Sequence, residues 1–157
     1  MTVALALVAS VWASALDARV RRIPNAACVI VAVCGMALQV GRLCAPDALS
    51  ALPVTSAVAD ALPAPLACVA WAVGGLVVGI SSEWWRRART GRSGMGLGDV
   101  KLIAAWTLTL GWLMLGALAA ACLLGALWAV MRGGRTFAMG PWLTLGCAAA
   151  LAVAAFA

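Results

Sequence analysis

The chain has 157 residues, of which 66% are hydrophobic and only 10% are charged, and its mean hydropathy is +1.07. This composition excludes an ordinary soluble domain and predicts a polytopic membrane protein. The formal net charge is +6, but the eleven Lys and Arg residues are spread in short clusters between apolar runs. Such clusters orient a protein in a bilayer, so the charge gives no reason to expect a nucleic-acid partner.

Six apolar segments follow one another along the chain and predict an all-α fold, a bundle of about six transmembrane helices, because about 20 apolar residues cross the hydrocarbon core. The predicted spans are Thr2–Leu16, Ala26–Leu43, Ala64–Ser81, Val100–Leu113, Met114–Val130 and Met139–Phe156. The fourth and fifth spans form one unbroken apolar run. We expect a tight hairpin there, at Gly111–Gly116, since a single span of that length would be far too long.

Residues 1–157 are therefore expected to form a single integral-membrane domain with two sizeable loops. Residues 44–63 contain three prolines and two aspartates, which predict a turn-rich external loop. Residues 83–98 are expected to form a cytoplasmic loop that leads into a glycine-rich motif.

The first apolar segment allows a second interpretation. It ends in Ala13-Ser14-Ala15, which looks like a signal-peptidase site. No basic residue precedes the apolar run, so we favour a retained first span. The mass of the mature N-terminus distinguishes the two.

The positions of the basic residues predict the orientation of the bundle. Three clusters follow the first, third and fifth spans: Arg19, Arg21 and Arg22; Arg86, Arg87, Arg89 and Arg92; Arg132 and Arg135. Only Arg42 is expected on the opposite side. Both termini are therefore expected outside and the three basic loops in the cytoplasm, where they would contact anionic membrane lipids.

The six cysteines do not form a C-x-x-C pair and predict neither a disulfide framework nor a metal site. Those inside apolar stretches are expected to be small buried hydrophobes: Cys28, Cys34, Cys68, Cys122 and Cys147. Cys44, near a predicted surface, is the one candidate reactive thiol. No metal or other cofactor is expected.

Asp17 and Asp99 stand at the cytoplasmic ends of predicted spans in a chain with only five acidic residues. An acid at such a boundary is costly unless it is paired or hydrated, and is therefore a functional candidate. Either residue alone could be a helix cap. The two at one depth, with Gly96 and Gly98 just before Asp99, predict a catalytic pair. Glycines there would allow unusual backbone angles and the close approach of a substrate strand, or would simply pack against other helices.

Elimination favours two carboxylates as the catalytic groups. The chain has no histidine, which excludes serine and cysteine triads and nearly all zinc hydrolases. Lys101, the single lysine, could activate Ser81, Ser82 or Ser93, but its position two residues after Asp99 favours a supporting role. Two carboxylates that share a proton can activate water. Because Asp99 begins a predicted helix and Asp17 ends one, the helix dipoles predict Asp99 as the base and Asp17 as the acid.

Three motifs together resemble the type IV prepilin leader peptidase family. They are the G-x-G-D stretch SGMGLGDVKL (Ser93–Leu102), DARVRRIPN (Asp17–Asn25) and FAMGPWLTLG (Phe137–Gly146). The resemblance implies an aspartic-type endopeptidase of the plasma membrane that cuts the short basic leader from pilin precursors on the cytoplasmic side. It implies catalysis by Asp17 and Asp99, with Gly96, Gly98 and Lys101 as supporting positions.

The chain departs from the longer members of that family. These carry an N-terminal cytoplasmic insert with two C-x-x-C pairs and N-methylate the cleaved pilin. Here only the stretch Asp17–Asn25 joins the first two spans, which argues against methyltransferase activity and is similar to the short peptidases of tight-adherence pili. Two alternatives remain open: a small proton- or cation-coupled transporter, and an inactive structural subunit of a secretion complex.

Overall fold

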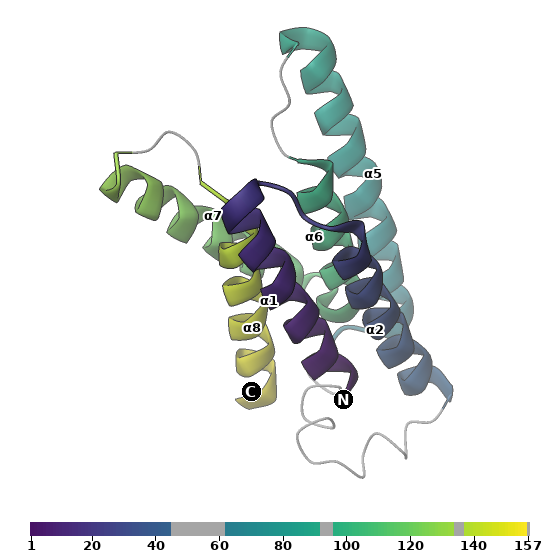
Figure 1. The fold of residues 1–157 in the computed structure, drawn as a ribbon. Helices are drawn as coiled ribbons and strands as arrows, with labels where there is room; N and C mark the ends of the chain where they lie inside the picture. The colour runs from purple at the N-terminus through teal and green to yellow at the C-terminus, as the bar shows by residue number, and fades with distance from the viewer. Residues whose placement is uncertain (45–61, 92–95, 134–136, 157) are drawn as a thin grey trace.

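A computed structural model describes residues 1–44, 62–91, 96–133 and 137–156, and within these ranges it contains six α-helices and no strand (Figure 1). The helices are α1 (Thr2–Val20), α2 (Asn25–Cys44), α5 (Pro65–Thr90), α6 (Leu97–Leu110), α7 (Leu113–Met131) and α8 (Met139–Phe156). The prediction of an all-α bundle is confirmed. Four of these helices, α1, α2, α5 and α7, are long and apolar enough to cross a membrane.

The centre of the bundle is α6. It has 14 residues, a length of about 21 Å, and packs against α2, α5, α7 and α8. Buried residues occur all around it, as expected of a helix enclosed by others, and the side chain of Trp106 is completely buried. Because other helices enclose α6, the side chains of its first turn lie among the ends of those helices.

The predicted hairpin between the fourth and fifth spans is confirmed and is very short. Gly111 adopts a positive φ of 57° and, with Trp112, joins α6 to α7. A Cβ at Gly111 would lie 2.9 Å from Pro63 and 3.0 Å from Cys68 Sγ, so only glycine fits against the start of α5. At the same end, Arg42 donates hydrogen bonds to the carbonyl oxygens of Leu62 and Pro63.

The fifth helix is longer than the predicted span. It has 26 residues and ends at Gly91, whose φ is 64°, so residues 83–90 continue the helix where a loop was expected. Figure 1 shows its last turns projecting beyond the rest of the bundle. Glu83 and Arg87 form an ion pair of 2.7 Å at i,i+4 spacing, and basic residues stabilise a helix C-terminus. Most of the expected external loop at 44–63 lies outside the described residues.

The cysteines follow the predicted pattern with one exception. Cys28, Cys34, Cys68 and Cys147 are buried, whereas Cys122 is exposed, and all are free thiols in the part of the chain that the structure describes. Cys122 was expected in the core. It lies on α7, which packs mainly against α8 and so leaves its outer face toward the bilayer.

Candidate active site

Three helix ends converge at one end of the bundle, opposite the two chain termini (Figure 1). The last turn of α1 carries Asp17, the first turn of α6 carries Asp99, and the first turn of α8 carries Gly140. The structure therefore brings together the two aspartates that the sequence singled out, although 81 intervening residues separate them.

Asp17 is held between α1 and α8. Its side chain is 6% exposed, and the backbone N–H of Gly140 donates a hydrogen bond of 2.9 Å to its Oδ2. The C-terminal end of α1 disfavours a negative charge, but the N-terminal end of α8 favours one. A hydrogen bond from a backbone N–H also stabilises the ionised form of a carboxyl group. The contact with α8 thus gives the Asp17 side chain a backbone N–H donor at the start of a helix.

Gly140 has no room for a side chain. A Cβ at this position would lie 3.1 Å from Oδ2 and 3.2 Å from Cβ of Asp17, and 3.4 Å from Cα of Ser14. Only the absence of a Cβ lets the backbone of α8 approach the carboxylate this closely. Gly140 lies in the motif FAMGPWLTLG, but the sequence alone predicted no role for this residue.

Asp99 lies in the first turn of α6, three residues after the N-cap residue Gly96. A backbone hydrogen bond with Gly96 links the Asp99 side chain to the start of its own helix, as in a helix cap. Oδ1 of Asp99 is buried and has no hydrogen-bond partner among the described residues. A cap contact therefore leaves one carboxyl oxygen of Asp99 without a partner.

The surroundings of Asp99 favour its protonated form. Asp99 precedes the apolar run that begins at Val100, so it lies outside the membrane-spanning segment. Burial, and then the negative charge of Asp17, raise the pKa of Asp99 to about 6, while a backbone hydrogen bond with Gly96 acts in the opposite direction. The two carboxyl groups are thus close enough to influence each other's protonation.

The second glycine of the G-x-G-D motif allows a close contact between α6 and the α1–α2 connection. A Cβ at Gly98 would lie 3.0 Å from Cβ of Ile23 and 3.5 Å from its carbonyl oxygen. The connection itself is short because Arg21 adopts the left-handed conformation, with φ of 54°, and Pro24 begins the next turn. Gly98 thereby lets the first turn of α6 approach the α1–α2 connection, which is the packing role that the sequence left open. The approach of a substrate strand stays a prediction.

Gly96 lies against the carboxyl group of Asp99. A Cβ at Gly96 would be 3.2 Å from Oδ2 of Asp99, a distance at which the carboxyl group would have to move. Gly96 therefore leaves space for the side chain of Asp99.

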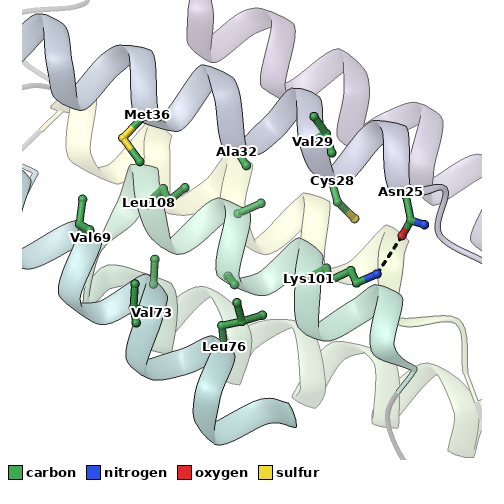
Figure 2. Close-up of a pocket in the computed structure, with 13 residues that line it drawn as sticks. Asn25, Cys28, Val29, Ala32, Met36, Val69, Val73, Leu76, Lys101 and Leu108 are labelled. Atoms are coloured by element: carbon green, nitrogen blue, oxygen red, sulfur yellow. Dashed lines mark hydrogen bonds between the residues drawn. The ribbon is translucent and has the colours of Figure 1, made fainter.

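Lys101 is directed away from Asp99, because residues two apart lie on opposite sides of a helix. Its Nζ donates a hydrogen bond of 3.1 Å to Oδ1 of Asn25, the first residue of α2 (Figure 2). Lys101 therefore ties α6 to α2. Of its candidate serine partners, Ser82 hydrogen-bonds the carbonyl of Gly79 in its own helix, and Ser93 lies outside the described residues.

Buried hydroxyl groups extend the contact between α1 and α8 into the bundle. Ser14 and Thr144 share a hydrogen bond of 2.7 Å, and the indole N–H of Trp106 donates to Ser10 at 2.8 Å. Ser10, Ser14 and Asp17 occupy one face of α1 at helical spacing, and Gly140 and Thr144 do so on α8. The helical spacing of these residues can be recognised in the sequence. Which helix packs against them cannot.

Glu83 is buried and forms an ion pair with Arg87 on its own helix. Two further arginines lie over tryptophan rings, Arg89 over Trp85 at 4.6 Å and Arg132 over Trp128 at 4.4 Å. These contacts lie at the same end of the bundle as the two aspartates.

Comparison with known proteins identifies the family of the chain. The sequence model of the type IV leader peptidase family matches residues 4–130, a range that includes Asp17 and Asp99 but ends before Gly140. No curated protein and no solved structure matches the chain. Because the match covers most of the sequence, the chain belongs to the type IV leader peptidase family.

Proposed function

We propose that the protein is an aspartic-type endopeptidase that removes the basic leader from prepilins, with Asp17 and Asp99 as its catalytic residues. The family match supports a leader peptidase. The observation that carries the aspartic mechanism is the convergence of the two carboxyl groups at one end of the bundle, where the charge of Asp17 raises the pKa of Asp99.

The different surroundings of the two groups assign their roles. Asp17, which accepts the N–H of Gly140, is the carboxylate that takes a proton from the attacking water. Asp99, whose protonated form is favoured, donates a hydrogen bond to the scissile carbonyl oxygen. This assignment reverses the one expected from the helix dipoles of α1 and α6 alone, because that expectation did not include the dipole of α8.

The reaction then follows a general acid–base course. The water oxygen bonds to the carbonyl carbon while Asp17 receives the proton and Asp99 protonates the carbonyl oxygen. Collapse of the tetrahedral intermediate breaks the C–N bond and returns the hydroxyl proton to Asp99. Asp17 gives its proton to the leaving amine, and both groups regain their starting states.

We place the site at the cytoplasmic face of the plasma membrane. The basic clusters that flank the site support this orientation: Arg19, Arg21 and Arg22 lie close after Asp17, the last turn of α5 carries two further arginines, and the C-cap residue of α7 is Arg132. Positively charged segments are retained on the cytoplasmic side, where the basic leader of a prepilin is also accessible.

The test is cleavage of a leader-bearing pilin fragment by membranes that contain the enzyme, followed by mass spectrometry of the new N-terminus. Asp17→Asn and Asp99→Asn should each lower the cleavage rate by about 10³-fold or more, and the double variant should be no slower than the single ones, because the two groups act as a unit. Asp47→Asn, the same chemical change in the predicted external loop, should retain activity. Wild-type rates in both single variants would exclude the mechanism and favour a transporter or an inactive subunit.

A further inference from the structure

An apolar groove runs along the outside of the bundle from the level of Lys101. α2 and α5 both pack on α6 but barely on each other, so they form two walls and α6 forms the floor (Figure 2). The groove has a volume of about 480 Å³. Several wall side chains are exposed, including Val29, Met36 and Val73, which leaves the groove open to the bilayer.

The two ends of the groove differ in polarity. Lys101 and Asn25 lie together at one end, joined by their hydrogen bond, and Met36 and Val69 lie toward the other end, as Figure 2 shows. The lining between these ends is apolar apart from the thiol of Cys28. An amphiphile with a negative head and an apolar tail matches this arrangement.

The length of the groove corresponds to one leaflet. Asn25 and Met36 are eleven positions apart on α2, which is about 16 Å of helix. The hydrocarbon core of a bilayer is about 30 Å thick, so the groove extends from the polar boundary to about the middle of the membrane. This is the depth that a single acyl chain reaches.

The groove suits a single acyl chain. It has a volume of about 480 Å³, its lining is almost entirely apolar and it is open to the bilayer along its side. The basic clusters lie at the same end of the bundle as Lys101, so the leaflet that meets this end is the one in which anionic lipids would be concentrated.

We propose that this groove binds an anionic phospholipid of the cytoplasmic leaflet, with one acyl chain along α2, α5 and α6 and its phosphate on Lys101 and Asn25. The ammonium group of Lys101 has three N–H donors, and only one is needed for Asn25. The others, with the amide N–H groups of Asn25, are available to phosphate oxygens. This inference does not depend on the proposed peptidase activity.

The test is photo-crosslinking with a phosphatidylglycerol that carries a diazirine on its acyl chain, in nanodiscs that contain the full-length enzyme. Crosslinks are expected in peptides from α2, α5 and α6. Val73→Trp fills the groove and should lower this crosslinking several-fold. Val77→Trp is the matched control, because Val73 and Val77 are one turn apart on α5 and both 57% exposed, but only Val73 lines the groove.

Lys101 is tested by headgroup preference. The wild-type enzyme and Lys101→Arg should favour the phosphatidylglycerol probe over a phosphatidylcholine probe by about fivefold, the effect of one cation near an anionic headgroup, and Lys101→Gln should remove the preference. Glycerol phosphate without acyl chains should not compete. Equal crosslinking of Val73→Trp and Val77→Trp, or competition by a pilin fragment in place of lipid, would overturn the proposal.

Discussion

The two aspartates at the site have different surroundings. Asp17 is buried and accepts the backbone N–H of Gly140 at the start of α8, whereas Asp99 is half-buried and has a pKa raised to about 6 by burial and by the charge of Asp17. A pair of like carboxyl groups with unlike surroundings separates into a base and an acid. The catalytic roles of both residues stay predictions.

Asp99 should make stability depend on pH. Its pKa rises from 3.8 to about 6 on folding, so the folded state binds this proton more tightly than the unfolded state does. Stability due to Asp99 is therefore lost as the pH rises from about 4 to about 6 and stays reduced above that range. Asp99→Asn removes this loss, and its melting temperature should exceed that of the wild type at pH 8 but match it at pH 4. An equal difference at both pH values would contradict the raised pKa.

Gly140 should be essential for the position of Asp17. In Gly140→Ala the new Cβ would lie within 3.1 to 3.2 Å of the carboxylate side chain, and Asp17 would have to move. A displacement of about 1 Å at a reacting group costs about 10²-fold in rate, so a shift of a few tenths of an ångström should lower the rate severalfold, which steady-state cleavage assays would measure. Gly116→Ala is the control, because nothing lies within 4 Å of a Cβ there. If both variants cleaved at the wild-type rate, the Gly140 contact would have no role in catalysis.

At the scale of elements, α6 is fixed by polar contacts as well as by apolar packing. The indole N–H of Trp106 reaches across to Ser10 of α1, and Gln39 of α2 donates a hydrogen bond of 2.6 Å to the carbonyl of Leu108. Hydrogen bonds between membrane helices add to close packing and fix the positions of the helices relative to one another. They hold α6 in the register that places its first turn beside the end of α1.

Ser10→Ala should destabilise the bundle. The N–H of Trp106, which is completely buried, would lose its partner, and an unpaired buried donor costs about 1–3 kcal/mol. Thermal unfolding in detergent should show a lower melting temperature. Ser82→Ala, an exposed serine on α5, should leave the melting temperature nearly unchanged. Equal stability of the two variants would show that the Trp106–Ser10 bond contributes little.

At the scale of the whole molecule, the bundle has one end with the aspartates and arginines and another with both termini (Figure 1). Two membrane orientations are possible for such a bundle, and the positions of the arginines predict the one with the site in the cytoplasm. The single described cation at the opposite end, Arg42, holds the start of α5 through backbone carbonyls.

The orientation is tested by labelling cysteines from outside intact cells with a membrane-impermeant maleimide. Cys44 is exposed at the end that is expected outside, and should react. In a variant that lacks the native cysteines, Arg21→Cys and Arg132→Cys should react only after the membrane is opened. Labelling of position 21 from outside, or of positions 21 and 132 from different sides, would exclude the proposed orientation.

The sequence by itself determined the six helices of the described residues, their approximate limits, the hairpin after α6 and the shared end of Asp17 and Asp99. These properties follow from hydropathy and charge along short stretches of the chain. A bilayer places apolar and charged stretches at different depths, however the helices pack. The sequence did not determine that α5 continues to Thr90. An ion pair and a C-terminal glycine stabilise the last turns of this helix, and neither raises the hydropathy of the segment.

Only the tertiary structure decided which residues surround the two carboxyl groups. The N–H of Gly140 on Asp17, the space at Gly98 for Ile23 and the groove beside Lys101 join segments that are tens of residues apart. Each depends on how closely two helices approach, and that distance is set by side-chain volumes on both partners at once.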